Sequence, residues 1–351
     1  MLDKIHIFTT IKNYKMMDYR KFTSTQTVNN ETGECFVMSS KQKIEKRHVN
    51  LEIKQNGNLY IEVSIPKFFF GENSKNITDE YFSPFVVEMY SILDDSGIRI
   101  IKDGFRSWKL SRIEFSFNLE MSNPVYVYID SLSKLWSPTR DEKTVYKRES
   151  VSFLMKGYKL IFYDKRKQML QKGNSYQKGI AENLTANILK VELQLEKKQT
   201  IDRIIGENKC LKDVFSQRFS IDLIIDQINE ILPDSFADIS YNHDDSLSLL
   251  KQCHQNIKRG SHDNYLLKKY AHYELEAYDF DVGRYHDDFL LKAYPPNLAR
   301  RKAKDVYDAL PFYLPQEQMK PLKEIMDKLY EIQASSTQRP VYHLKTREGV
   351  Y

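Results

Sequence analysis

Three glutamates stand in the middle of segments that otherwise look like apolar strands: Glu62 in LYIEVSI, Glu114 in SRIEFSF and Glu192 in ILKVELQLE. Because side chains alternate between the two faces of a strand, each carboxylate is expected on a polar face, opposite a face that packs into a core. Mg²⁺ and Mn²⁺ prefer carboxylate oxygens, and either ion can polarise a phosphodiester. We take the three glutamates as candidate metal ligands. The alternative is a set of amphipathic strands with a solvated outer face.

A basic segment that is rich in aromatic residues runs from Arg140 to Lys178. It holds eleven Lys or Arg residues against four Asp or Glu residues, whereas the whole chain of 351 residues has a net charge of +5. Cations interleaved with aromatic rings suit a polyanion whose bases can stack, such as single-stranded or melted DNA. Lys159, Arg166 and Lys167 are the candidate DNA contacts. The alternative is a solvated, charged hairpin.

Tyr163, in KLIFYDKRKQ, is the candidate nucleophile of this segment. A phenol has an ordinary pKa near 10, so it needs a nearby cation, or a metal ion that activates the phosphate. Lys165 is the expected cation, because strand alternation puts it on the same face as Tyr163 and Tyr158 on the other. A phosphotyrosine adduct conserves the energy of the broken linkage, so both nicking and rejoining become possible. Tyr176, in GNSYQKG, stays open as an alternative or second nucleophile.

The elements that must position these groups are mainly strands up to about residue 205. One helix is predicted in ITDEYFSPFVVEMYSILDDSG, with Pro84 in its first turn and Gly97 at its end. Long strands with few strand–helix–strand repeats favour an α+β fold, in which an antiparallel or mixed sheet carries helices on one face. The predicted strands are IHIFTTI, HVNLEIKQ, NLYIEVSI, RIEFSFNL, VYVYI, YKLIFYD and ILKVELQLE.

Beyond Gly206 the apolar residues recur every three or four positions, which predicts an all-helical region. This favours two domains, a catalytic one over residues 1–205 and a helical one over residues 206–351, whose last dozen residues are expected to fray. The first helix should end before Pro233. The predicted helices are CLKDVFSQRFSIDLIIDQINEIL, SLSLLKQCHQNI, NYLLKKYAHYELEAY, NLARRKAKDVYDAL and PLKEIMDKLYEIQ.

Several common chemistries lose their usual sequence signatures. The three cysteines are far apart, which argues against a disulfide framework, and the eight histidines form no metal-binding motif. No Gly-rich phosphate loop or serine-hydrolase elbow is present. The start MLDKIHIFTTIKNYK lacks an apolar signal core, and no apolar run reaches the length of a membrane span. We therefore expect a protein of a reducing cytoplasm with no membrane partner.

Taken in order, these segments resemble the gene II-type replication initiators of filamentous phages, over the chain from the N-terminal strand to about residue 232. The resemblance is carried by YIEVSIPKFFFGEN, LSRIEFSF, KTVYKRES, KLIFYDKRKQ and ILKVELQLEKK. That family looks like a distant relative of the HUH nickases in which the histidine pair is replaced.

The resemblance implies a rolling-circle replication initiator, an endonuclease that nicks DNA site-specifically with Mg²⁺ or Mn²⁺ and transfers the strand through a 5′-phosphotyrosine. It implies origin DNA, both duplex and single-stranded, as the partner, with host helicase and polymerase beside it, a homodimer as one possible assembly and a bacterial host cytoplasm as the location. The alternative is a non-enzymatic phage or plasmid DNA-binding regulator, which needs the basic segment but neither the glutamates nor the tyrosine. The implied site residues are the nucleophile Tyr163, the metal or proton-handling groups Glu62, Glu114 and Glu192, and the phosphate contacts Arg112 and Lys165.

Overall fold

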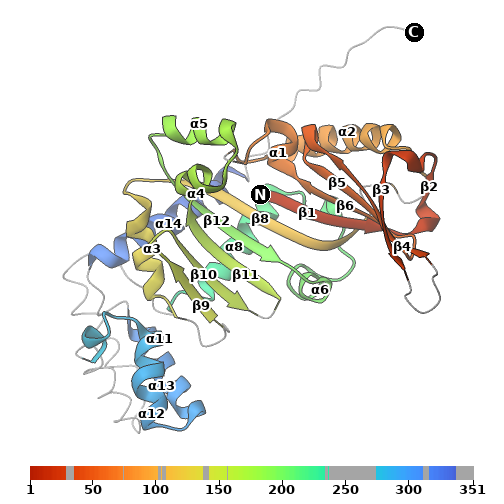
Figure 1. The fold of residues 1–351 in the computed structure, drawn as a ribbon. Helices are drawn as coiled ribbons and strands as arrows, with labels where there is room; N and C mark the ends of the chain where they lie inside the picture. The colour runs from red at the N-terminus through yellow and green to blue at the C-terminus, as the bar shows by residue number, and fades with distance from the viewer. Residues whose placement is uncertain are drawn as a thin grey trace.

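The fold is α+β and is built on one ten-stranded antiparallel sheet, which confirms the predicted class (Figure 1). The computed structural model describes residues 1–28, 35–73, 75–101, 104, 108–136, 142–155, 157–233, 236, 274–310 and 316–336. The strands of the sheet, in their spatial order, are β3 (Thr23–Val28), β4 (Cys35–Ile44), β5 (Val49–Lys54), β6 (Leu59–Ser64), β1 (Leu2–Thr9), β8 (Lys109–Met121), β12 (Asn187–Leu195), β11 (Tyr158–Asp164), β10 (Ser150–Met155) and β9 (Glu142–Tyr146). A separate pair is formed by β2 (Tyr14–Met16) and β7 (Ile98–Ile100).

The centre of the sheet brings together strands that are far apart in the chain. β1 lies between β6 and β8, and β12 lies between β8 and β11. The register sets Glu192 opposite Ser116 of β8 and Ile161 of β11, and it sets Tyr163 opposite Lys190. Three of the strands singled out by their charged residues are therefore direct neighbours.

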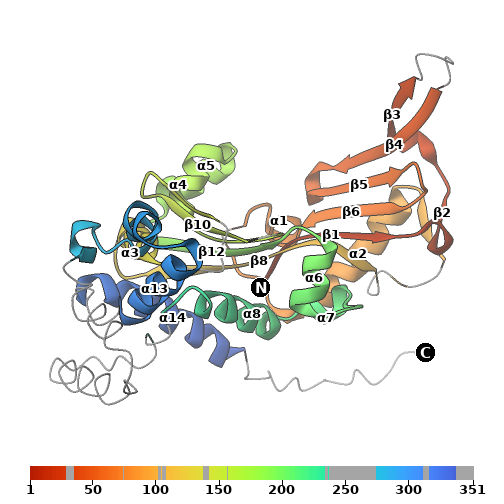
Figure 2. The same cartoon turned by 90° about the horizontal axis from the view of Figure 1, so that it is seen from below.

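The two faces of the central strands differ as their alternation predicts. On β8, Ile113, Phe115 and Phe117 are fully buried in the core, while Arg112 and Glu114 point to the polar face. Helices that cover the apolar face contact β8, β11 or β12, and Figure 2 shows them below the sheet. They are α3 (Val125–Lys134), α6 (Lys198–Ile205), α8 (Gln217–Asn229) and α14 (Gln316–Ser335).

Short helices flank the polar face. α1 (Ile65–Phe70) contacts β1 and β6, and α4 (Lys165–Lys172) contacts β11 and β12. α5 (Ser175–Asn183) packs on α4. The predicted helix with Pro84 in its first turn is α2 (Phe82–Asp95), which ends just before Gly97. The polar face is thus bordered by α1 on one side and by α4 on the other (Figure 1).

The segment VYVYI, which was predicted as a strand, belongs to helix α3. Its β-branched residues favour a strand locally, but Val125, Tyr128, Ile129 and Leu132 follow a helical spacing and are all buried. Pro124 at the N-cap suits the start of a helix. Burial of one helical stripe against the sheet overrides the local strand preference.

The region after Gly206 is mostly helical, as expected, with one break in its first helix. α7 (Leu211–Val214) ends before α8, and the side chain of Ser216 caps α8 by accepting a hydrogen bond from the N–H of Phe219. Two later predicted helices are confirmed as α13 (Pro296–Ala309) and α14, and α11 (Val282–Tyr285) and α12 (Leu291–Ala293) precede them. The predictions for SLSLLKQCHQNI, most of NYLLKKYAHYELEAY and the last dozen residues lie outside the described residues.

Helices of this region share the core of the sheet. Both α8 and α14 pack against β8, and their apolar residues belong to the same buried cluster as the strands. The division at residue 205 therefore stays a prediction. Over the described parts of the chain, no helix combines the length and the apolar character needed to cross a membrane.

Candidate functional site

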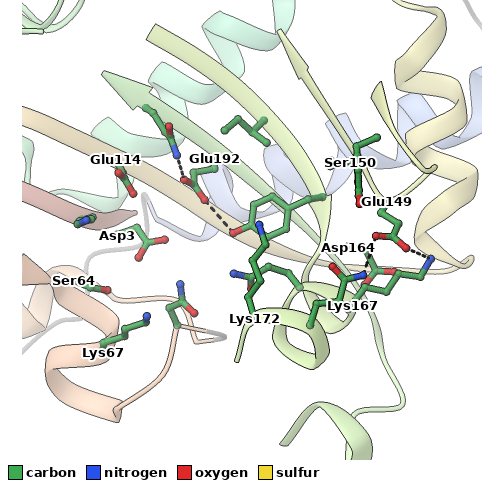
Figure 3. A pocket seen from close by; sticks show the side chains of 18 residues that line it. Asp3, Ser64, Lys67, Glu114, Glu149, Ser150, Asp164, Lys167, Lys172 and Glu192 are labelled. Carbon is green, nitrogen blue, oxygen red and sulfur yellow. Dashed lines mark hydrogen bonds and ion pairs between the residues drawn. The ribbon is translucent and has the colours of Figure 1, made fainter. Parts of the chain in front are cut away.

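A pocket of about 530 Å³ opens on the polar face of the central strands (Figure 3). Its wall combines the ends of β1, β8, β11 and β12 with α1, α4 and the start of β10. Figure 3 shows the carboxylates of Asp3, Glu114 and Glu192 on one side of the pocket and Lys67 of α1 below them. The remaining lining residues are Lys4, Ser64, Asn73, Tyr146, Glu149, Ser150, Ile161, Tyr163, Asp164, Lys167, Gln168, Gln171, Lys172 and Gln194.

Tyr163 and Glu192 form a hydrogen-bonded pair inside this pocket. The Tyr163 hydroxyl donates to Oε2 of Glu192 at 3.0 Å. Burial raises the pKa of the Tyr163 phenol well above its usual value, Lys190 opposes this effect, and the negative charge of Glu192 adds to it. The phenol is therefore held protonated, and the group placed to accept its proton is a carboxylate.

Glu114 is the second carboxylate of the pocket and is only 8% exposed. Arg112 donates to its Oε1 from Nη2 at 2.7 Å. Burial, and next the negative charge of Glu192, raise the pKa of Glu114 to about 7. Two carboxylates that oppose each other's ionisation in a buried place would be relieved by a cation between them.

Asp3 and Lys190 add a buried ion pair that sequence analysis missed. The Lys190 ammonium donates to Asp3 Oδ2, and both side chains are almost fully buried. The register of β1 against β8 shifts between Leu2 and Lys4, which lets Asp3 and Lys4 both face the pocket. The signal available in the sequence was a charged residue inside each of two apolar strands.

Glu62 does not join the other two glutamates. It lies on β6, one strand further out, where it pairs with Lys4 and its Oε1 is 3.5 Å from His6 Nε2. Contacts with His6 and then with Lys4 lower its pKa to about 2, against the effect of burial. Glu62 is absent from the pocket wall, and the described residues hold no group of three or more His, Cys, Asp or Glu side chains that could bind a metal ion. The predicted trio of glutamate ligands is therefore reduced to Glu114 and Glu192.

Lys165 is placed differently from the strand-based prediction. Strand β11 ends at Asp164, so Lys165 is the first residue of α4 and does not continue the strand face. Its ammonium is 1% exposed and donates to Asn73 Oδ1 at 2.7 Å and to Gln168 Oε1 at 2.9 Å. Burial, and next the charge of Lys190, lower the pKa of Lys165 to about 7. The cation that acts most strongly on the phenol is Lys190.

The predicted DNA contacts divide into two groups. Lys167 lines the pocket, where its ammonium is 3.5 Å from Glu149 Oε1. Lys159 lies further along β11 beside Glu196, and Arg166 donates from Nε to the carbonyl of Ala181, so neither is part of the pocket wall. Sequence analysis missed the lining lysines Lys4, Lys67 and Lys172, because the pocket wall is assembled from separate elements.

The competing tyrosines lie elsewhere. Tyr158 is 3% exposed and its hydroxyl donates to the sulfur of Met155, on the apolar side of the sheet. Tyr176 is 63% exposed on α5 and is absent from the pocket wall. Of these three phenols, only that of Tyr163 faces the carboxylate pocket.

Fold and site together define an α+β protein with a buried tyrosine–carboxylate pair in a lysine-rimmed pocket. A scan against protein-family models finds no match for the chain, and a search of the curated proteins finds none either. The function is therefore argued from the chemistry of the pocket.

Proposed function

We propose that the protein is a metal-dependent DNA-nicking enzyme whose nucleophile is Tyr163. The observation that carries this proposal is the hydrogen bond from the Tyr163 hydroxyl to Glu192 Oε2, at 3.0 Å, inside a pocket. A nucleophile within hydrogen-bond reach of a base is the arrangement that covalent catalysis requires. A purely structural tyrosine needs neither a carboxylate partner nor an adjoining open pocket.

The proposed step conserves atoms and charge. The Tyr163 oxygen attacks the phosphorus of a DNA phosphodiester and gives its proton to Glu192 Oε2. The bond from phosphorus to the 3′ oxygen breaks, and that oxygen takes a proton from water to become a 3′ hydroxyl. The 5′ phosphate stays joined to Tyr163. Attack by a 3′ hydroxyl on this adduct reverses the step and rejoins a strand.

Glu114 and Glu192 are the residues that fit a divalent cation. Both are oxygen donors in one pocket, and the raised pKa of Glu114 reflects in part the charge of Glu192. Mg²⁺ is commonly held by one or two carboxylates, with substrate phosphate and water completing its shell. When bound, Mg²⁺ or Mn²⁺ supplies charge neutralisation at the phosphoryl oxygen and the leaving oxygen. Glu62 is not needed for this site, because it is held by Lys4 and His6.

The lysines of the pocket supply attraction for a phosphate. Lys67 of α1 and Lys172 of α4 line it from separate elements, together with Lys167. Deeper in the structure, the Lys190 ammonium bonds Asp3 behind the phenol. These cations offset the negative charge that the carboxylates and a phosphate would otherwise bring together.

Within this proposal, the likeness of the strand segments to filamentous-phage initiators favours rolling-circle initiation at an origin in a bacterial host cytoplasm. The free 3′ hydroxyl would serve as a primer for a host polymerase, with a host helicase opening the duplex. The competing hypothesis is a non-enzymatic DNA-binding regulator, which the Tyr163–Glu192 pair does not favour because binding alone requires no nucleophile.

A denaturing gel separates the two hypotheses. Purified protein is incubated with supercoiled DNA of the replicon that carries its gene, in 5′-labelled and 3′-labelled forms, with Mg²⁺ or Mn²⁺. The proposal predicts a nick and a label that migrates with the protein, both lost in Tyr163→Phe and both retained in the matched controls Tyr158→Phe and Tyr176→Phe. Wild-type protein that binds the DNA without nicking it would support the regulator instead.

A further inference from the structure

The turn that joins β9 to β10 has a strained backbone. It spans Tyr146–Glu149, and the N–H of Glu149 donates to the carbonyl of Tyr146 at 2.8 Å. Both central residues have positive φ, 46° for Lys147 and 54° for Arg148. A two-residue hairpin turn of this kind favours Asn, Asp or Gly, because side chains with longer branches fit the left-handed region poorly. Two long cationic residues therefore occupy positions where the backbone alone would select others, a pattern found at functional sites.

The turn presents an aromatic ring and a cation beside the pocket. Tyr146 is 52% exposed and is one of two aromatic residues in the pocket wall, the other being Tyr163. The Lys147 ammonium lies 5.2 Å from the centre of the Tyr146 ring. Arg148 is held by Asp130 of α3, its Nε donating to Oδ1 at 2.8 Å, which fixes the turn to the helix behind it.

Other aromatic residues of the basic segment do not share this placement. Phe153, Tyr158 and Phe162 are buried in the core of the sheet. Tyr176 is exposed but lies on α5, outside the pocket wall. Tyr146 is thus the aromatic side chain of this segment that is both exposed and in contact with the pocket of Tyr163.

We propose that the Tyr146–Glu149 turn binds an unpaired nucleotide next to the phosphate held in the pocket. Tyr146 stacks on its base, and the Lys147 ammonium binds the adjoining phosphate. An aromatic face can stack on any base, but a base inside a duplex is already covered by its neighbours, so the turn selects single-stranded or melted DNA. This inference rests on the proposed function in taking DNA as the ligand.

Binding of a single strand without cleavage tests the role of Tyr146. A fluorescently labelled 12-nucleotide single-stranded oligodeoxynucleotide is titrated with protein in EDTA, and anisotropy gives Kd. Tyr146→Ala should weaken binding about 5- to 150-fold, the range for loss of one base stack, while Tyr146→Trp and the surface control Tyr176→Ala should keep it. Equal affinity of Tyr146→Ala and wild type for the single strand would overturn the inference, as would an equal loss on a duplex of the same sequence.

A second variant uses the strain of the turn. Lys147→Asn introduces a residue that tolerates positive φ, so the thermal unfolding midpoint should rise or stay unchanged. The affinity for the single strand should fall, and the slope of log K against log salt should flatten by about 0.7, because one phosphate is no longer neutralised. An unchanged slope would show that Lys147 has only a structural role. Because these titrations involve no chemistry, a failure to form the covalent adduct would count against the nickase alone.

Discussion

Glu114 should reduce the stability of the protein at neutral and higher pH. It is 8% exposed, and burial together with the charge of Glu192 raises its pKa from 4.5 to about 7. In Glu114→Gln the side chain keeps its shape and cannot ionise, so the cost of the buried charge disappears. The variant should therefore be more stable than wild type at pH 8 but inactive in nicking.

The size of this effect follows from proton linkage. Between its unfolded pKa of 4.5 and its folded pKa of about 7, the folded protein binds the proton more strongly than the unfolded chain does. The stability that the protonated carboxyl provides is therefore complete below pH 4.5 and is lost as the pH rises through about 7. The difference corresponds to about 3 kcal/mol of unfolding free energy at pH 8 and to almost nothing at pH 4.

Urea unfolding of wild type and Glu114→Gln at pH 4, 6 and 8 measures this difference, provided that both remain reversible. Glu62→Gln is the matched control, since contacts with His6 and Lys4 lower the pKa of Glu62 to about 2. The stability from Glu62 is present above its unfolded pKa and is lost as the pH falls through its folded value, so Glu62→Gln should destabilise the protein at pH 8. A Glu114→Gln variant that gains no stability between pH 4 and pH 8 would refute the reasoning.

Three further outcomes are expected. Removal of divalent cations with EDTA should abolish nicking, and added Mg²⁺ or Mn²⁺ should restore it; full activity in EDTA would rule out the proposed cation at Glu114 and Glu192. The nicking rate should rise as the pH passes through about 7, because Glu114 must lose its proton to bind a cation, and a flat profile from pH 6 to pH 8 would contradict this role. If α13 docks on duplex DNA, neutralising its four cations should lower the slope of log K against log salt by up to about 0.9 for each phosphate that they neutralise, whereas an unchanged slope would make it a solvated face; these cations are Arg300, Arg301, Lys302 and Lys304.

Local periodicity predicted the strands that carry the pocket. Alternation along SRIEFSF and ILKVELQLE puts Glu114 and Glu192 opposite buried apolar residues, and the structure has that arrangement. The same argument chose Tyr163 over Tyr158, and the two phenols do lie on different faces. These successes share a cause, because a strand with one buried face fixes the direction of each side chain.

Long-range order was beyond the sequence. Which strands become neighbours depends on the whole sheet, so nothing local showed that β1 separates Glu62 from Glu114 or that Asp3 would bond Lys190. The end of β11 at Asp164 was equally hidden, and it moved Lys165 from the strand face into a helix. In VYVYI, strand propensity was outweighed by packing of a helical stripe that includes Leu132.

The most direct test of the account is the position of the covalent bond. Wild-type protein is trapped on cleaved DNA, digested with trypsin and nuclease, and analysed by tandem mass spectrometry for a nucleotide-bearing tyrosine. The account predicts a phosphotyrosyl linkage on the peptide that contains Tyr163, with no adduct in Tyr163→Phe. A linkage at Tyr176, or an adduct that survives Tyr163→Phe, would contradict the assignment of the Tyr163–Glu192 pair as the catalytic centre.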